Sequence, residues 1–462
     1  MSLKRKSLQT VVFPILFLSV LLQVGFGGGA SRVEQPQDGG TLLKDLLALP
    51  SNRFDPYRAA LLLGGPDKAS AELLSYLADL SASVARRTDI HDPRGYLAEA
   101  VSVVFGREGF RLAASDLPEE KLFFHKVLQE REGPEVALAL VLHAALSSVA
   151  FPVRVFFGNA GYELVSGPSG GLYRLSVRTG RVAPLVSDKN DSLPGYSVLS
   201  RRQLVGRYAV VIGRAARREG DKAGAQKLLR IAWHLAPQQA DLYAELGMLA
   251  LGEWELARAE RLFKRALGLD PTLRTALVGR ADLLVREGRL QAAEAALNRI
   301  FSSDRNDFKG NLIRGELFLE REEYAAAYDQ FRRLTARKPQ SARAWVGLGL
   351  AALGRRDRPG ARAALETAER LASSSPEALC ALGRWWAEED PEKALTYFRE
   401  AIRANSKYAP AYYYRGLLYE ERGLAQAALE DYRAYVSLVP DHPRSTELQG
   451  RIENLRKELS GQ

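Results

Sequence analysis

Small and large apolar residues recur with a fixed period from about Gly206 to Pro440. A Gly or Ala returns every 34 residues, with one step of 33 near the end, and a large apolar residue returns in the second half of each unit. Small residues let paired helices approach closely, and the large side chain fills the gap beside them. The pattern therefore predicts about seven helix pairs. The small residues are Gly213, Gly247, Ala281, Gly315, Gly349, Gly383 and Gly416, and the large ones are Leu229, Phe263, Leu297, Phe331, Leu365, Phe398 and Tyr432.

A 34-residue period with this composition resembles the tetratricopeptide repeat. One helix pair cannot bury its apolar face alone, so neighbouring pairs stack into a curved array. We expect the repeats over 206–442, with units beginning near residues 206, 240, 274, 308, 342, 376 and 409. An amphipathic segment follows, and we expect it to form a C-terminal capping helix and tail over 443–462.

The pattern upstream of the repeats mixes helical and strand periods. Helical spacing predicts helices over 69–85, 117–129 and 133–149, and the last is apolar on all sides, which indicates burial. Alternating positions then predict strands over 151–157, 162–165, 172–177 and 181–186. The chain is thus expected to be mainly α, with a small α+β domain over 42–200 before an α-solenoid.

Residues of about 55–200 also resemble the transglutaminase-like superfamily, in its bacterial branch that carries tetratricopeptide repeats. The resemblance is carried by 103–110, 124–133, the helix over 134–149 and Phe151-Pro152-Val153. Active members use a Cys at a helix N-terminus, where its thiol pKa is lowered, together with a strand His and a third polar residue. The resemblance puts the Cys position at Glu135 and the His position at Tyr162. It therefore implies a domain that has lost its catalytic triad.

The N-terminus has a separate pattern. Basic residues at positions 4–6 precede an apolar run over 11–24 and a Gly-rich string. This order is typical of a secretory signal peptide over 1–30, and an uncleaved membrane anchor is the alternative. A polar linker is expected over 31–41. We accordingly expect an exported protein of the periplasm or cell envelope, with membrane association through the apolar run as a second possibility.

Composition adds few candidate chemistries. The formal net charge is +10, but acidic and basic residues alternate along the predicted helices, which is typical of solvated surfaces, so no nucleic-acid partner is expected. The single cysteine, Cys380, excludes an intrachain disulfide, and the five histidines lack metal-ligand spacing. No phosphate-binding or dinucleotide motif is present. The sequence thus predicts neither a metal nor a cofactor.

The first helices of the repeats are expected to line a concave groove that takes protein or peptide partners. The leading hypothesis is therefore a non-catalytic exported scaffold. The alternatives are a peptidase or amidase of the cell envelope that uses the transglutaminase-like cleft, and a basic module that binds anionic membrane or nucleic acid. One class of tetratricopeptide proteins clamps the C-terminal carboxylate of a peptide with Asn and Lys residues on adjacent first helices. The corresponding positions here hold other residues, which disfavours that activity. The candidate groove residues are Arg214, Arg217, Met248, Asp282, Arg286, Lys309, Glu316, Arg343, Arg384, Glu388, Tyr413 and Glu420.

Overall fold

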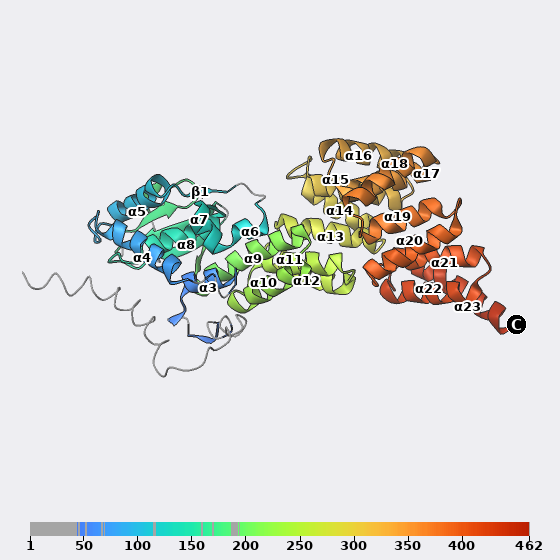
Figure 1. The fold of residues 1–462 in the computed structure, drawn as a ribbon, viewed down its shortest axis with the longest axis horizontal. Helices are drawn as coiled ribbons and strands as arrows, with labels where there is room; N and C mark the ends of the chain where they lie inside the picture. Colours follow the sequence, from blue (N-terminus) through green and yellow to red (C-terminus); the bar gives the residue numbers. More distant parts are fainter. Residues whose placement is uncertain are drawn as a thin grey trace, which may run out of the picture. The chain divides into compact units, whose positions relative to one another are not determined.

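The structure is a computed structural model (Figure 1). Its chain divides into two compact units, Met1–Pro237 and Gln238–Gln462. It describes residues 44, 47–50, 53–65, 68, 70–113, 117–158, 160–168, 171–185, 193 and 195–461. The predicted leader and linker, 1–30 and 31–41, lie outside the described residues. We call the part up to Pro237 unit 1 and the part from Gln238 unit 2.

The apolar helix α8 (Glu135–Ala145) is the core of unit 1, and every residue from Val136 to Leu142 is buried. It packs against helices α3, α4, α5 and α9 and strand β4. The expected helix over 117–129 is instead two helices, because Phe123 adopts extended backbone angles between them. The other helical elements before α9 are α3 (Pro56–Leu62), α4 (Ala71–Ala85), α5 (Pro93–Val101), the π-helical turn η3 (Ser102–Arg107), α6 (Glu119–Leu122) and α7 (Phe124–Glu130).

A five-stranded antiparallel sheet follows α8 in the order β6-β5-β4-β3-β7. The sequence predicted four of these strands and missed β7, whose first residues were assigned to a loop. A second, parallel pair of two-residue strands joins β1 (Arg111–Leu112) to β2 (Glu132–Gly133). The five strands are β3 (Arg154–Gly158), β4 (Gly161–Ser166), β5 (Tyr173–Ser176), β6 (Val182–Pro184) and β7 (Tyr196–Leu199).

The first helix pair, α9 (Arg201–Glu219) and α10 (Lys222–Leu235), belongs to unit 1. Helix α9 begins with a capping box at Ser200 and packs on α3, α6, α8 and β7. The Tyr208 hydroxyl donates to the Leu122 carbonyl, and the Arg207 guanidinium lies 3.8 Å from the Phe157 ring centroid. The first 34-residue unit is therefore built into the N-terminal core, although its period is that of the later repeats.

Unit 2 consists of six helix pairs and a final helix, α23 (Pro443–Ser460). The first helices of the pairs begin at residues 240, 274, 308, 342, 376 and 409, the positions given by the period of the sequence. The pairs are α11 (Ala240–Gly252) with α12 (Leu256–Leu269), α13 (Arg274–Arg286) with α14 (Leu290–Phe301), α15 (Phe308–Glu320) with α16 (Tyr324–Arg337), α17 (Ala342–Gly354) with α18 (Arg358–Leu371), α19 (Pro376–Trp386) with α20 (Pro391–Ala404), and α21 (Ala409–Glu421) with α22 (Ala425–Leu438).

Five glycines of the repeat each receive the large side chain of the partner helix. At Gly247, a Cβ atom would lie 2.6 Å from the buried Phe263 ring, closer than real side chains approach. Only glycine therefore permits this helix spacing. The same contact recurs between Gly315 and Phe331, Gly349 and Leu365, Gly383 and Phe398, and Gly416 and Tyr432.

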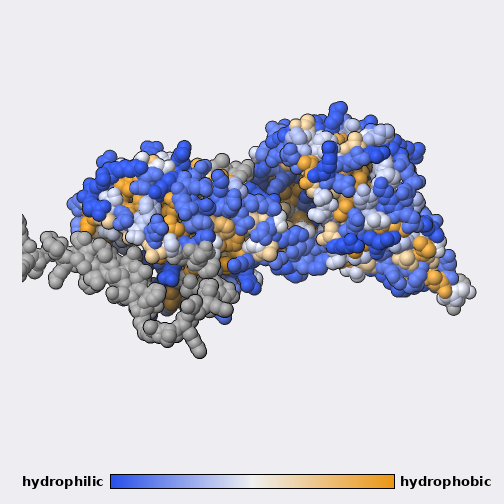
Figure 2. Space-filling model, in the orientation of Figure 1, coloured by the Kyte–Doolittle hydropathy of each residue, from blue (hydrophilic) through white to orange (hydrophobic). Residues whose placement is uncertain are grey.

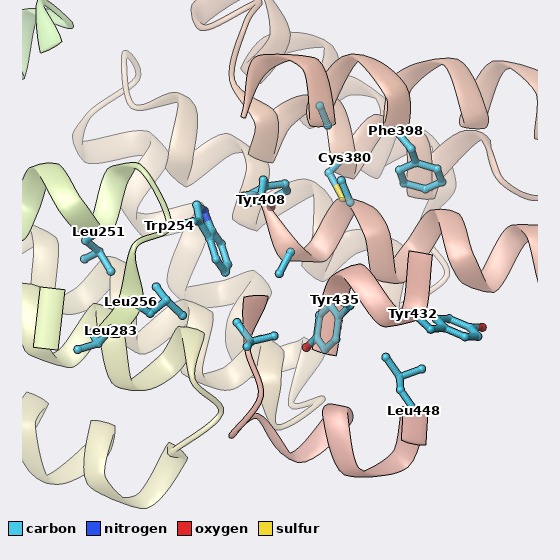
Figure 3. Packing of buried hydrophobic residues seen from close by; sticks show 14 of the residues in the cluster. Leu251, Trp254, Leu256, Leu283, Cys380, Phe398, Tyr408, Tyr432, Tyr435 and Leu448 are labelled. Carbon is cyan, nitrogen blue, oxygen red and sulfur yellow. The ribbon is translucent and has the colours of Figure 1, made fainter. Parts of the chain in front are cut away.

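The second and seventh helix pairs of the chain contact each other. The Trp254 and Tyr408 rings meet edge to face with centroids 5.0 Å apart. Both side chains are labelled in Figure 3. Beside them, Lys407 Nζ lies 2.7 Å from Glu255 Oε1. Trp254 and Tyr408 are both at least nine-tenths buried, so this contact is part of the core of unit 2. The repeats of unit 2 thus close on themselves.

The surface is mainly hydrophilic on the face drawn in Figure 2, where apolar residues are scattered between charged ones. Within the described ranges, no helix combines the length and the apolar character that a membrane-spanning segment requires.

Candidate functional site

Unit 2 contains a cavity of about 170 Å³. Its walls come from the first helices of five consecutive pairs, α13, α15, α17, α19 and α21, and from the start of α23. The closing contact between Trp254 and Tyr408 supplies part of the wall. Half of the groove residues chosen from the sequence line this cavity: Asp282, Arg286, Glu316, Arg343, Arg384 and Tyr413.

Four of these residues form one charge network across three neighbouring pairs. Arg343 donates to Asp282 Oδ2 at 2.8 Å and, through two nitrogens, to both Glu316 oxygens at 2.6 Å. Arg286 donates to Asp282 Oδ1 at 2.9 Å and to the Leu251 carbonyl at 3.2 Å. Two carboxylates and two guanidinium groups thus neutralise one another, and their hydrogen bonds tie α13, α15 and α17 together.

The electrostatics of Asp282 follow from this pairing. Its side chain is only 4% exposed. Burial alone opposes ionisation, but the guanidinium groups of Arg286 and Arg343 outweigh it and hold the Asp282 pKa well below its usual range. Asp282 is therefore a charged anchor of the cavity wall at neutral pH, and its two oxygens are already occupied.

The remaining charges of the cavity are arranged differently. Arg444 is paired with Glu320, with 2.9 Å between Nη2 and Oε2. Arg384 instead lies over the Tyr414 ring, with its Cζ 4.3 Å from the centroid. Tyr414 in turn meets Tyr413 edge to face at 5.0 Å. This part of the cavity combines a cation with tyrosine rings.

The other candidate groove residues lie elsewhere. Arg214 and Arg217 are on α9 in unit 1, Met248 packs against the core of unit 2, and Lys309 is exposed. Glu388 pairs with Arg358 at 2.7 Å, and Glu420 pairs with Arg451 at 3.0 Å. None of the six lines the cavity. Sequence spacing placed most of the candidates on first helices, but it could not resolve which turn of a helix faces the cavity.

Glu135 and Tyr162 do meet in unit 1. Glu135 Oε1 accepts from the Tyr162 backbone amide at 2.8 Å, and Oε2 accepts from Arg178 Nη2 at 2.8 Å. Gly161, with φ of +110°, makes room, because a Cβ there would lie 2.1 Å from Glu135 Oε1. Both carboxylate oxygens are thus engaged, and the arrangement ties α8 to the sheet. No sequence signal pointed to Arg178, which lies in the turn after β5.

Cys380 lines the cavity, but it is not a nucleophile at neutral pH. Its side chain is buried, and burial raises the pKa of the thiol to about 12. The thiol thus stays protonated, and the residue acts as a small apolar side chain in the wall. The described parts of the chain bring no three His, Cys, Asp or Glu side chains together in a way that could hold a metal ion.

Comparison with known families agrees with this architecture. Two family models, both described as tetratricopeptide repeat, match the chain, one at residues 250–311 and the other at 312–376 and 386–443. These segments are tetratricopeptide repeats. The matched segments begin within α11 and thus lie wholly in unit 2.

Relatives of this chain match it at low identity, 25–29%. Cellulose synthase operon protein C of Xanthomonas axonopodis pv. citri is 27% identical over 343 residues, which cover 70% of this chain and 19% of that protein. DnaJ homolog subfamily C member 3 of Rattus norvegicus is 25% identical over 231 residues, 46% of each chain. The chain therefore spans less than half the length of these relatives.

Solved structures of tetratricopeptide proteins are also similar. A repeat protein from Parabacteroides merdae shares 16% identity with a TM-score of 0.37, covering 54% of this chain and 98% of its own. PilW, described as a widely conserved type IV pilus biogenesis factor, shares 16% identity with a TM-score of 0.33, covering 44% of this chain and 94% of its own.

Proposed function

We propose that this chain is an exported, non-catalytic scaffold that binds protein or peptide partners in the cavity of unit 2. Tetratricopeptide arrays in general present a concave surface to partner proteins. The observation that supports the proposal is the cavity wall, to which the first helices of five consecutive pairs contribute charged and aromatic side chains. Aromatic and arginine side chains dominate the binding energy of protein interfaces.

The size of the cavity supports a peptide rather than a cofactor. Its volume of about 170 Å³ is below the roughly 300–1,000 Å³ of sites that enclose small-molecule ligands. A side chain or a short extended segment of a partner would fit this volume. The internal charge network would then preserve the shape of the site, while the tyrosines and Arg384 contact the partner.

Unit 1 is proposed to be a transglutaminase-like domain without catalytic activity. Glu135, at the position where the resemblance places the nucleophile, has both oxygens engaged by the Tyr162 amide and Arg178. A general base needs a free lone pair directed at its substrate. No contact among the described residues therefore favours the peptidase or amidase alternative.

The binding proposal is tested by peptide selection against the purified full chain, with Leu350→Trp as the variant that fills the cavity. Leu350 lines the cavity and is only half-buried, so a larger side chain is tolerated there. We expect peptides selected on the unsubstituted protein to lose binding to Leu350→Trp and to keep binding to Arg362→Ala, a change on an exposed part of α18. Equal binding to both variants would contradict the proposal.

Export is tested separately by fractionating cells that express the tagged full chain. We expect the protein outside the cytoplasm and, if the signal is cleaved, a mass reduced by about the first 30 residues. Recovery of the full-length chain from the cytoplasm alone would contradict export without affecting the binding proposal.

A further inference from the structure

Arg384 differs from the other three arginines of the cavity. Arg286, Arg343 and Arg444 each have a carboxylate of the chain within 2.9 Å. Arg384 has no such partner among the residues that the structure describes, although its side chain is partly buried and lines the cavity. Because no carboxylate of the described residues pairs with it, Arg384 is the position in the cavity where an incoming anion would gain most.

The surroundings of Arg384 explain why no acid of the chain reaches it. Its guanidinium lies over Tyr414, which holds the group in place through a cation–π contact at 4.3 Å. The acidic residue on the same face of α19 is Glu377, seven positions earlier, or about 10 Å along the helix at 1.5 Å per residue. Glu377 accepts from the Ser375 hydroxyl at 2.8 Å in the first turn of α19. The two opposite charges are therefore kept apart.

We propose that the cavity recognises a peptide segment through one acidic side chain, whose carboxylate binds the Arg384 guanidinium. This inference rests on the proposed peptide-binding function and specifies its partner. A guanidinium presents two parallel N–H donors that match the two oxygens of a carboxylate. Tyr408 and Tyr414, both in the cavity wall, would contact apolar side chains that flank the acidic residue.

The other charges of the cavity limit the partner to a single acidic residue. Four carboxylates and four arginines line the same space. Three of the arginines are already paired with three of the carboxylates, so only Arg384 can pair with an incoming acid and a second negative charge would find no cation. A polyacidic tract is thus disfavoured, and an acidic residue between apolar neighbours is favoured. The four are Asp282, Glu316, Glu320 and Glu377.

The test is selection from a random dodecapeptide library on three full-length proteins: the unsubstituted chain, Arg384→Glu and Arg362→Glu. Arg362→Glu makes the same charge change on an exposed part of α18 outside the cavity. We expect the unsubstituted chain and Arg362→Glu to enrich peptides with one Asp or Glu, and Arg384→Glu to enrich Lys or Arg at that position. Replacing the acidic residue by its amide in a selected peptide should weaken binding about tenfold or more.

Arg384→Met provides a second measurement, because Met keeps the apolar part of the side chain over Tyr414. We expect it to unfold at the same urea concentration as the unsubstituted chain and to bind the acidic peptide and its amide equally. Selected peptides that occupy the cavity without preferring an acid, or an acid preference that survives in Arg384→Glu, would overturn this inference and leave the proposed function standing. Failure of any peptide to compete for the cavity would overturn both.

Discussion

Replacing Arg343 by Met removes the centre of the charge network in unit 2. Arg343 makes three hydrogen bonds of 2.6–2.8 Å to Asp282 and Glu316. Removing one partner of a buried ion pair costs about 3–5 kcal/mol, because the other charge is left uncompensated. The Arg343 side chain is 37% exposed, and Asp282 keeps Arg286. We therefore expect a smaller loss, about 2–3 kcal/mol, in the free energy of unfolding.

Urea unfolding of the full chain, followed by tryptophan fluorescence, measures this loss, because four of the five tryptophans lie in unit 2. The matched control is Arg362→Met, which breaks the pair with Glu366 on the surface, where both side chains are more than half exposed. Such exposed pairs are screened by solvent and contribute little to stability. A loss for Arg343→Met no larger than that for Arg362→Met would refute the reasoning.

A second substitution distinguishes two causes of the stability loss in Arg343→Met. One is the lost attraction between Arg343 and its partners, and the other is the uncompensated charge left on Glu316. In the Arg343→Met background, Glu316→Gln removes the carboxylate that has lost its cation. If the desolvated charge causes most of the loss, the double variant should regain about 1 kcal/mol over Arg343→Met alone. A further loss on adding Glu316→Gln would show that Glu316 is stabilised by something other than Arg343.

Three more predictions concern the backbone and pH. Gly161→Ala should destabilise unit 1 by about 3 kcal/mol, through its positive φ and the close carboxylate oxygen. Gly109→Ala, with positive φ but open space, should cost about 1 kcal/mol in a urea titration followed by circular dichroism, which also reports on unit 1. Gly347→Ala should lower the free energy of unfolding of unit 2 by about 1–2 kcal/mol, because its Cβ would lie 2.3 Å from a buried ring. Burial lowers the pKa of both His143 and His442 from 6.5 to about 4. As the pH falls below 6.5, the unfolded chain protonates these histidines while the folded chain keeps them neutral. The free energy of unfolding should therefore be full above pH 6.5 and fall by up to about 3 kcal/mol per histidine as the pH drops to 4. A urea midpoint that is unchanged between pH 7 and pH 4.5 would contradict this.

The sequence predicted the repeats well because their packing is local. Gly247 and Phe263 belong to one helix pair, and the same contact recurs in four later pairs of unit 2, so the period of the sequence is enough to predict it. The break at Phe123 could not be predicted in the same way, because the helical spacing continues through it. Strand β7 was missed because it is short and pairs with β3, about 40 residues earlier in the chain.

The candidate site could be predicted only in part. Spacing placed Asp282, Glu316 and Arg343 on first helices, but their pairing depends on the rotation and stacking of neighbouring repeats. These charges are 27 and 61 residues from Arg343, and no local pattern links them. Tyr408 and Arg444 could not be predicted as site residues for the same reason, because they enter the cavity wall only when the array closes.

The contact between Trp254 and Tyr408 also determines how unit 2 would fold and unfold. In an open solenoid each repeat contacts only its neighbours, so the end repeats fray and the stability is a sum of local terms. Here Glu255 and Lys407, 152 residues apart, join the two ends. Contacts of such long sequence separation raise the contact order, slow folding and suppress fraying, because an end repeat can detach only by breaking the closure. Unit 2 should therefore melt as one cooperative body, and a circular permutant that opens the chain in a mid-array loop should remain folded.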